Sequence, residues 1–180
     1  MADTITHLMT VDEFRLLPET GPFYYELRRG ELVSVTRPKM KHVKVQRRLR
    51  QLLEAMTGNS GIVEIEIAFR AIAEHDLRIA DVAFVSQERW QRADPDDNLL
   101  GAPELVIEVL SPSNTATEIF DKEKLCLENG CREFWVVDPV RRQVKVSTPD
   151  GLTKTYPEGQ QIPMGLFHGV ALPVATIFSE

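Results

Sequence analysis

The 180-residue chain has few cysteines and no long apolar run, and these two absences exclude two broad classes of protein. No apolar stretch approaches the roughly 20 residues that a membrane-spanning helix needs. The sequence also opens without the charged and apolar segments of a secretory signal. Its two cysteines, Cys126 and Cys131, fit neither a zinc knuckle nor a secreted disulfide framework. We therefore expect a cytoplasmic protein that does not enter a membrane, with reduced and partly buried thiols.

Several enzyme signatures are also absent. The sequence contains no Gly-rich phosphate loop of the Walker or dinucleotide type, no His-Glu-x-x-His and no Gly-x-Ser-x-Gly. These motifs supply a phosphate cradle, a pair of zinc ligands and an activated serine, respectively. Their absence argues against a kinase, a dehydrogenase, a zinc protease and a serine hydrolase.

The chain does contain enough apolar sequence for a sizeable core. Hydrophobic residues make up 43% and charged residues 27% of it, so residues 1–180 predict a single domain. Helical spacing or helix-start signals occur at 9–18, 40–56 and 111–129, and β-rich runs at 24–27, 31–35, 61–70, 78–85, 104–110, 131–138 and 142–147. The polar stretch 89–101 predicts a loop. This order predicts a mixed α/β fold in place of a regular βαβ alternation.

The strand predicted for residues 61–70 shows strict alternation of apolar and polar residues. Alternate side chains of a strand point to opposite faces of the sheet. The two predicted faces are Val63, Ile65, Ile67 and Phe69 on one side, and Glu64, Glu66 and Arg70 on the other. We expect the charged face to be exposed to solvent; the alternative is that Glu64 and Glu66 extend an acidic cluster.

Charge is distributed unevenly along the sequence. Residues 28–50 hold nine basic residues and one acid, a net charge of +8, which leaves −14 on the rest of a chain whose total is −6. A basic segment on an acidic protein is typical of a phosphate-binding surface, although a charged helix face is often merely solvated. The helix predicted for 40–56 would present the candidate nucleic-acid contacts Lys41, His42, Lys44 and Arg48.

Two acidic residues lie in apolar segments that the sequence predicts to be buried strands. Asp81 lies within Arg78–Val85 and Glu108 within Glu104–Leu110. An isolated buried carboxylate is costly, so each must be paired, protonated or bound to a cation. By strand parity, Asp81 shares a face with Ile79, Ala83 and Val85, and Glu108 shares one with Glu104 and Val106.

Neighbouring strands that bring these acids to one edge would create a site for Mg²⁺ or Mn²⁺, which prefer oxygen ligands. The backbone carbonyl of Val109 would complete the site. The helix after Glu108 supplies two lysines, Lys122 and Lys124, that could orient a water molecule or neutralise developing charge. Both lie at the margins of its apolar face, so helical periodicity does not choose between them.

Five segments of the chain resemble the Uma-two family of restriction endonuclease-like proteins, within the PD-(D/E)XK nuclease superfamily. The resemblance covers roughly residues 10–180 and is specific only when the segments are taken together. They are Tyr25–Leu32, His42 at a helix start, Ile79–Val85, Leu105–Ser113 and Gly130–Pro139. The resemblance implies a restriction-endonuclease-like mixed β-sheet flanked by helices, and a homodimer.

The same resemblance implies roles for individual residues. Asp81 corresponds to the metal-binding aspartate of the superfamily, and Glu108 to the acidic residue of the next strand. Leu110 stands where the superfamily has lysine, and the family carries its lysine on the following helix, at Lys122 by an ungapped count. Glu26 matches an early glutamate that touches a second metal or a water.

These residues also have plainer interpretations. The two acids could pair with Arg78, Arg70 or Lys122 inside the fold, and Lys122 could be a surface lysine that lies along apolar atoms. Glu26 could simply close the turn at residues 28–30. The function implied is DNA hydrolysis by a Mg²⁺- or Mn²⁺-dependent endonuclease; the alternative is a catalytically inactive module that binds nucleic acid or protein.

Overall fold

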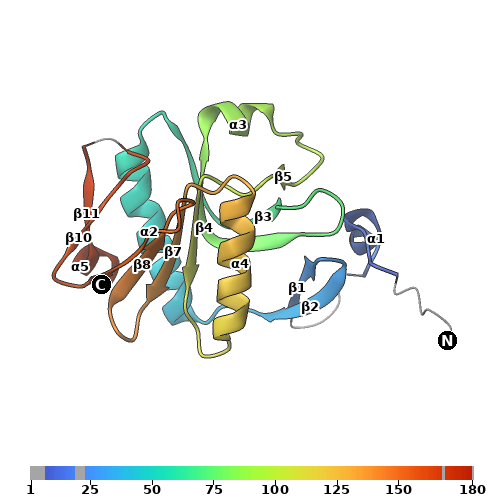
Figure 1. Ribbon diagram of the computed structural model, residues 1–180, viewed down its shortest axis with the longest axis horizontal. Helices are drawn as coiled ribbons and strands as arrows, with labels where there is room; N and C mark the ends of the chain where they lie inside the picture. Colours follow the sequence, from blue (N-terminus) through green and yellow to red (C-terminus); the bar gives the residue numbers. More distant parts are fainter. Residues whose placement is uncertain (1–6, 19–22, 168, 180) are drawn as a thin grey trace.

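A seven-stranded mixed sheet forms the centre of the structure, a computed structural model that describes residues 7–18, 23–167 and 169–179 (Figure 1). The strand order is β5-β3-β4-β6-β7-β8-β9; β3–β5 and β6–β7 pair parallel and the other neighbours antiparallel. The strands are β3 (Gly61–Arg70), β4 (Arg78–Ser86), β5 (Leu99–Leu100), β6 (Leu105–Val109), β7 (Glu133–Asp138), β8 (Gln143–Ser147) and β9 (Thr153–Pro157).

The other elements lie around this sheet. Two small antiparallel pairs accompany it, β1 with β2 and β10 with β11. Their bounds and those of the helices are α1 (Val11–Arg15), β1 (Phe23–Arg28), β2 (Glu31–Thr36), α2 (Met40–Thr57), α3 (Gln87–Arg92), α4 (Ala116–Glu128), β10 (Gln161–Pro163), β11 (Ala171–Pro173) and α5 (Val174–Ile177).

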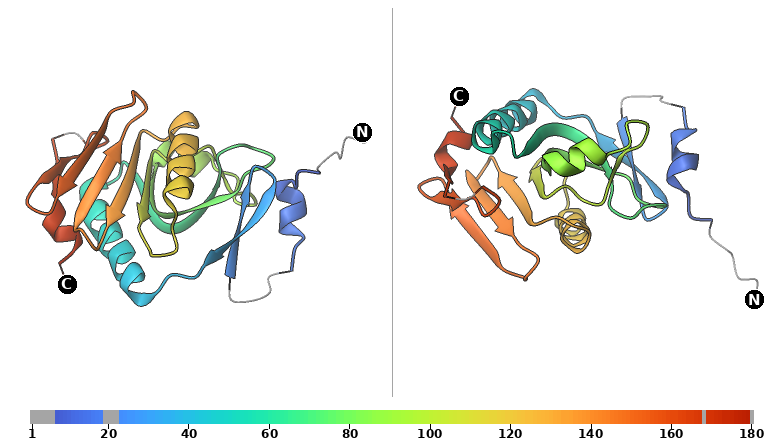
Figure 2. Two further views of the ribbon diagram at one scale, coloured as in Figure 1. Left: turned by 60° about the horizontal axis from the view of Figure 1, so that its bottom comes forward. Right: turned by 90° about the horizontal axis from the view of Figure 1, so that it is seen from above.

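Helices α2 and α4 cover opposite faces of the sheet (Figure 2). Each helix buries one row of side chains against the strands, and each fully buried large apolar side chain contributes about 1.5–3 kcal/mol. The α2-side core includes Leu49, Leu53, Val63, Val82, Phe84, Leu105, Ile107 and Trp135. The α4-side core includes Phe69, Ala80, Ala83, Val85, Val106, Leu125, Cys126 and Phe134.

β3 changes the face that it presents at Glu66. Ile65 packs against the α2-side core, whereas Ile67, two residues later, packs against the α4-side core. Glu66 has a φ of +53°, a left-handed conformation that interrupts the alternation of an ordinary strand. The strand prediction for 61–70 is confirmed, but its strict alternation is wrong at this residue.

β4 changes face at the same level. Ala80 belongs to the α4-side core and Val82 to the α2-side core, although parity alone would place them together. The prediction that Asp81 shares a face with Ala83 and Val85 is therefore wrong. The altered backbone path turns Asp81 toward α2 and away from the α4-side core.

The β1–β2 hairpin lies beside one end of the sheet and is fixed there by a small third core. Arg29 and Gly30 form its turn with φ values of +51° and +82°, as the predicted tight turn requires. Leu27 bridges to Leu77 before β4, and Val11 of α1 packs against both leucines. This attachment holds Glu26, in β1, close to the start of β4.

The C-terminal segment closes the α2-side core. Apolar side chains from β10, β11, α5 and the loop between the two strands pack beside α2; they are Ile162, Met164, Phe167, Leu172, Val174 and Ile177. The predicted loop at 89–101 is wrong in part, because α3 extends to Arg92 and β5 pairs parallel with β3. Among the described residues, the structure has no helix with the length and apolar character needed to cross a membrane.

Candidate active site

Asp81 and Glu108 lie on the neighbouring antiparallel strands β4 and β6. They stand one step beyond the paired residues Val82 and Ile107, so the register places them opposite each other. The Val109 backbone N–H donates to Asp81 Oδ2 at 2.7 Å, and Asp81 N lies 3.5 Å from Glu108 Oε1. The structure therefore brings the two predicted metal-binding acids together.

Two residues of α2 bind the other oxygen of Asp81. His42 Nε2 lies 3.0 Å from Asp81 Oδ1, and Gln46 Nε2 donates to the same oxygen at 3.1 Å. Burial alone would lower the pKa of His42, but the hydrogen bond and charge of Asp81 raise it above the usual value. His42 was predicted to contact phosphate; the structure places its ring against the candidate metal ligand instead.

Lys122, from α4, binds Glu108 on the opposite side of the sheet. Its Nζ lies 2.8 Å from Glu108 Oε1 and donates to the Ile79 carbonyl at 2.6 Å. Glu26 Oε1 is 3.6 Å from the same Nζ and accepts the Ile79 backbone N–H at 3.0 Å. Only 7% of Lys122 is exposed, so the interpretation as a surface lysine is wrong.

The charges at this site are strongly coupled. Burial raises the pKa of Glu108; Lys122 lowers it, Asp81 raises it, and the resulting value is about 7. Burial would lower the pKa of Lys122, but the carboxylates of Glu108, Glu26 and Asp81 raise it above its ordinary range. Lys122 is therefore a protonated hydrogen-bond donor at neutral pH and not a general base.

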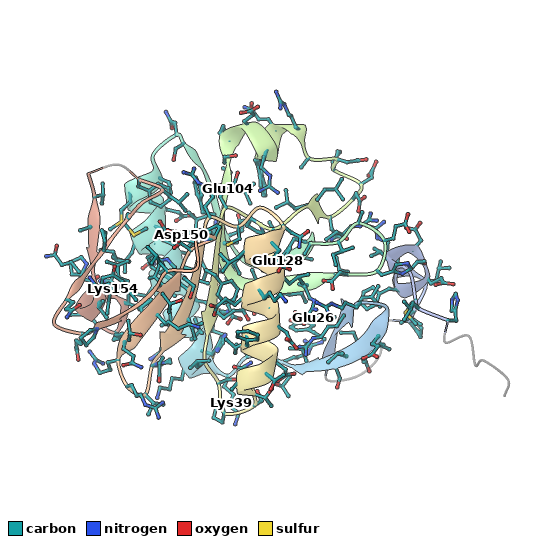
Figure 3. All side chains as sticks on the ribbon, viewed as in Figure 1. Glu26, Lys39, Glu104, Glu128, Asp150 and Lys154 are labelled. Carbon is teal, nitrogen blue, oxygen red and sulfur yellow. The ribbon has the colours of Figure 1, made fainter. Side chains whose placement is uncertain are left out.

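Lys124, the other lysine of α4, lies outside this arrangement. It is exposed and stands 3.9 Å from Glu128 on the helix surface. Figure 3 shows Glu128 toward the end of α4 that is remote from Lys39. The structure thus separates two lysines that helical periodicity left equivalent, and it places only Lys122 beside the acids.

An ionic chain continues from Lys122 to the start of α4. Arg28 Nε donates to Glu26 Oε2 at 3.0 Å, and another Arg28 nitrogen donates to Glu118 Oε1 at 2.8 Å. Burial raises the pKa of Glu26, but Lys122, the Ile79 N–H and Arg28 together hold it below its usual value. Glu26 does more than close a turn, because it joins the β1–β2 hairpin to the candidate catalytic lysine.

The predicted basic face of α2 is only partly available to a ligand. Lys41 and Lys44 are exposed, and Lys41 lines the cavity above the acids. Arg48 instead donates to the Thr176 carbonyl and to Ser179 Oγ, at 2.9 and 3.2 Å, near the C-terminus. The structure does not bring Arg48 to the site, because helical rotation directs it toward α5.

A cavity of about 640 Å³ opens above these residues. Asp81, Glu108 and Lys122 belong to its lining, together with residues of the β1–β2 hairpin, the β6–α4 loop and the β7–β8 turn. A concave site with convergent charged groups is the usual setting of an active site. The buried acids are thus accessible to a ligand from one side.

The donor set has the chemistry that a small divalent cation requires. Both acids provide hard oxygen ligands, and no described residue donates a hydrogen bond to Glu108 Oε2. The described residues contain no cluster of three or more His, Cys, Asp or Glu side chains arranged around a common metal position. A carbonyl and water molecules would fill the remaining positions, as is common for Mg²⁺. Two carboxylates, a carbonyl and water molecules are a type of ligand set that Mg²⁺ or Mn²⁺ accepts.

Sequence reasoning missed Gln46 and Arg28, and it favoured solvent over the acidic cluster for Glu66. Gln46 is a polar residue on the same helical row as the buried Leu49 and Leu53, and that signal could have identified it. The pairing of Arg28 with Glu118 joins residues 90 positions apart, which local spacing does not predict. Glu66 was expected in solvent but lines the cavity.

Comparisons with known proteins agree with this fold. A solved structure described as a "putative nuclease" of family DUF820, from Anabaena variabilis ATCC 29413, superposes with a TM-score of 0.80 at 22% identity. The match covers 94% of this chain and 97% of that one, so the two share a fold. The profile of the Uma2 family, described as "Putative restriction endonuclease", matches residues 11–175, and the chain belongs to this family. No curated protein matches the sequence.

Proposed function

We propose that this protein is a Mg²⁺- or Mn²⁺-dependent endonuclease that hydrolyses phosphodiester bonds of DNA. The position of Lys122 is the observation that best supports the proposal. The superfamily lysine is missing at Leu110, yet an ammonium group from α4 lies 2.8 Å from Glu108 Oε1. Two carboxylates and a buried cation at the floor of a cavity form the set that metal-assisted phosphodiester hydrolysis needs.

Each residue of the set has a distinct role in the proposal. Asp81 and Glu108 would hold the metal ion, with the Val109 carbonyl as a further ligand. The bound ion supplies a Lewis acid that polarises a phosphoryl oxygen and lowers the pKa of a water molecule. Lys122 uses two of its three N–H groups on Ile79 and Glu108, and the third can orient the attacking water. Glu26 holds Lys122 in this position.

Two other functions were considered from the sequence. Leu110 in the usual lysine position favours a catalytically inactive binding module, whereas the position of Lys122 beside Glu108 supports an active enzyme. A purely structural role for the acids is supported by their hydrogen bonds with Lys122, His42 and Gln46. The experiments below distinguish these functions.

A cleavage assay tests the proposal. Plasmid and oligonucleotide DNA are incubated with the protein in Mn²⁺, Mg²⁺ or chelator, and the Asp81→Asn, Glu108→Gln and Lys122→Met variants are compared. We expect metal-dependent cleavage that the two acid variants lack and that Lys122→Met reduces about 100-fold or more. Lys124→Met is the matched control, because it removes an exposed lysine of the same helix, and it should cleave normally.

Calorimetric titration with Mn²⁺ tests the metal site without relying on activity. Wild-type protein and Lys124→Met should bind Mn²⁺ equally, and Asp81→Asn and Glu108→Gln should lose that binding. If both acid variants still cleave DNA, the assigned site is wrong. If Mn²⁺ binds nowhere near these acids and no DNA is cleaved, their role is structural.

Two further parts of the proposal concern binding and assembly. Lys41 and Lys44 would contact backbone phosphates, so DNA affinity should fall with increasing salt. The family resemblance also suggests a homodimer. Sedimentation velocity across a range of protein concentrations tests the dimer, since a mass that stays near 20.4 kDa would contradict it.

A further inference from the structure

The cavity above the acids has two walls from distant parts of the chain. One wall comes from the β1–β2 hairpin and the segment after it, with Tyr24, Val35 and Arg37. The other comes from the β6–α4 loop and the β7–β8 turn, with Leu110 and Val140. Asp81 and Glu108 line the same cavity, so a substrate must pass between these walls to reach them.

The two walls touch each other beside the site. Thr36 Oγ1, at the end of β2, lies 3.3 Å from Ser113 Oγ in the β6–α4 loop. The volume of about 640 Å³ lies in the range of pockets that enclose small ligands. A DNA duplex is much wider, since its major groove alone spans about 12 Å. The size of the cavity therefore favours a nucleotide strand over an intact duplex.

The chemistry of the walls suits exposed bases. The Arg37 guanidinium lies 4.7 Å from the centre of the Tyr24 ring, and this stacked pair faces the cavity. Leu110, Ile119 and Val140 add apolar surface to the lining. Aromatic rings and arginine planes stack on unpaired bases, whereas a duplex hides its base faces and presents phosphates and sugars. An apolar, stacking-competent wall would have little to contact in paired DNA.

Three exposed cations lie on one rim of the cavity. Arg37, Lys39 and Lys41 line the cavity, are exposed and have no ion-pair partner among the described residues. The rest of the basic segment is partly occupied, since Arg28 and Arg50 form ion pairs with glutamates. Three cations can follow a few phosphates of one strand. Among the described residues that line the cavity, they are the exposed cations without an ion-pair partner, and a duplex-binding protein of net charge −6 would need a more extended basic surface there.

From these features we infer that the substrate enters the site as an unpaired DNA strand. Its bases stack against Tyr24 and Arg37, and its phosphates pass Lys39 and Lys41 toward the acids. The inference rests on the proposed nuclease function and names the substrate class of that same site. Free single strands, flaps and locally opened duplexes all present such a strand.

Binding and cleavage are measured separately to test the inference. Fluorescence anisotropy in Ca²⁺ compares a labelled 15-nucleotide strand with its blunt duplex, and cleavage in Mn²⁺ uses the same two substrates. We expect at least tenfold tighter binding and faster cleavage of the single strand. With about three phosphate contacts, log K for the strand should fall with log salt at a slope of about −2.

Two adjacent tyrosines provide a matched pair of variants. Tyr24 and Tyr25 are similarly exposed, at 36% and 37%, but only Tyr24 lines the cavity. Tyr24→Ala should weaken strand binding about 5- to 100-fold, the usual range for loss of one stacked base. Tyr25→Ala should bind as wild type, and Tyr24→Phe should retain affinity because it keeps the ring. Arg37→Lys keeps the charge and should still weaken strand binding.

The outcomes separate this inference from the nuclease proposal. Cleavage of the duplex with equal or tighter duplex binding would overturn the unpaired-strand inference and leave the nuclease function intact. Equal losses for Tyr24→Ala and Tyr25→Ala would also overturn it. Absence of cleavage on both substrates, with a retained tenfold preference for the strand, would overturn the nuclease function and support a strand-binding cavity.

Discussion

At the scale of single residues, the site is a balance of buried charges. Glu108 and Lys122 are each 7% exposed and Glu26 is 3% exposed, so none of the three is stabilised mainly by water. A buried ion pair contributes little compared with apolar replacements, but removal of one member leaves the other charge uncompensated. Stability and function are therefore coupled at these three residues.

Lys122→Met should destabilise the protein strongly. The variant leaves Glu26 and Glu108 buried without their shared cation, which costs about 3–5 kcal/mol in unfolding free energy. Urea denaturation at pH 7.5 measures the loss. Lys124→Met should stay within about 0.5 kcal/mol of wild type, because Lys124 is exposed.

A double variant keeps this prediction testable if Lys122→Met folds poorly. Lys122→Met combined with Glu108→Gln removes one of the two uncompensated charges, so it should regain part of the lost stability. An equal or larger loss in the double variant would show that Lys122 and Glu108 do not depend on each other.

Gln46→Leu should change the unfolding free energy and the affinity for Mn²⁺ in different ways. Gln46 is 1% exposed, and its Nε2 donates a hydrogen bond to Asp81. Among the described residues, its Oε1 is the only buried side-chain N or O atom without a hydrogen-bond partner. Leucine removes an unsatisfied acceptor, so unfolding free energy should stay level or rise by about 1 kcal/mol. Mn²⁺ affinity should fall about 10- to 100-fold, as for other groups that orient a metal ligand.

The control for Gln46→Leu is Gln51→Leu, an exposed position of the same helix. Thermal denaturation and Mn²⁺ titration are run on both variants. A Gln46→Leu protein that is less stable than wild type but binds Mn²⁺ normally would show that Gln46 supports the core and not Asp81.

Individual residues also show what the sequence could predict. Asp81 and Glu108 were identifiable because a carboxylate in a buried strand needs a partner, whatever the fold. Lys122 was chosen over Lys124 by counting residues along the family motif. Helical periodicity alone places both lysines at the margins of the apolar face of the helix. The contact of His42 with Asp81 depends on how α2 lies across β4, which no local pattern records.

At the scale of elements, α4 links the candidate site to the hydrogen bonds formed at the N-terminal end of the same helix. Thr115 and Glu118 form a reciprocal capping box, and Glu118 also accepts a hydrogen bond from Arg28 at 2.8 Å. The bond from Arg28 and the backbone N–H of Thr115 lower the pKa of Glu118 to about 2. The start of α4, which carries Lys122, is thereby attached to the β1–β2 hairpin.

The pH dependence of stability should reveal this attachment. Because the folded pKa of Glu118 lies below its ordinary value of 4.5, its contribution is complete above that pH and is lost as pH falls toward about 2. Glu118→Gln should be less stable than wild type at pH 6, and the difference should shrink between pH 4.5 and 2. Urea midpoints measured at several pH values check this.

Glu128→Gln is the matched control on α4. Glu128 is exposed at the other end of the helix and lies 3.9 Å from Lys124. Its difference from wild type should be small at every pH. A gap between Glu118→Gln and wild type that does not change with pH would contradict the role of the Glu118 charge.

The sequence predicted most of the helices and strands, but it did not predict the irregularities within them. Capping signals located α1, and alternation located β3, because both are properties of neighbouring residues. The face change at Glu66 and Asp81 lies where the pairing of β3 with β4 is interrupted, between the pairs Ile65–Val82 and Ile67–Ala80. A glutamate with φ of +53° carries no sequence signal, since glycine or asparagine is the usual residue there.

At the scale of the whole molecule, contacts between distant segments complete the fold. The hairpin, the sheet and α4 meet at Glu26, Arg28 and Lys122, and the last twenty residues close the α2-side core. The composition predicted a core of adequate size but not which segments would close it. The Pro- and Gly-rich C-terminal region has little periodicity, so its packing was not predictable from pattern.

Glu133 is the residue that fastens this C-terminal segment to the sheet. Its carboxylate, in β7, accepts the Trp135 indole N–H at 3.0 Å, and the nearby backbone N–H groups of Gly165 and Leu166 act to lower its pKa. Burial outweighs these bonds and raises the pKa of Glu133. The carboxylate lies so close to Gly165 that an added Cβ would stand 2.6 Å from Glu133 Oε1.

Gly165→Ala should therefore loosen the C-terminal closure. A carboxylate at the end of a side chain usually moves aside easily, but this one would lose its hydrogen bond to Trp135 and its favourable contact with the backbone N–H groups of the segment if it moved. The expected loss is about 1–3 kcal/mol of unfolding free energy. Gly159→Ala is the control, because an added Cβ there meets nothing within 4 Å. Urea denaturation measures the unfolding free energy of both variants. A loss confined to Gly165→Ala would show that this contact closes the α2-side core. Equal stability of the two variants would mean that Glu133 does not hold the segment.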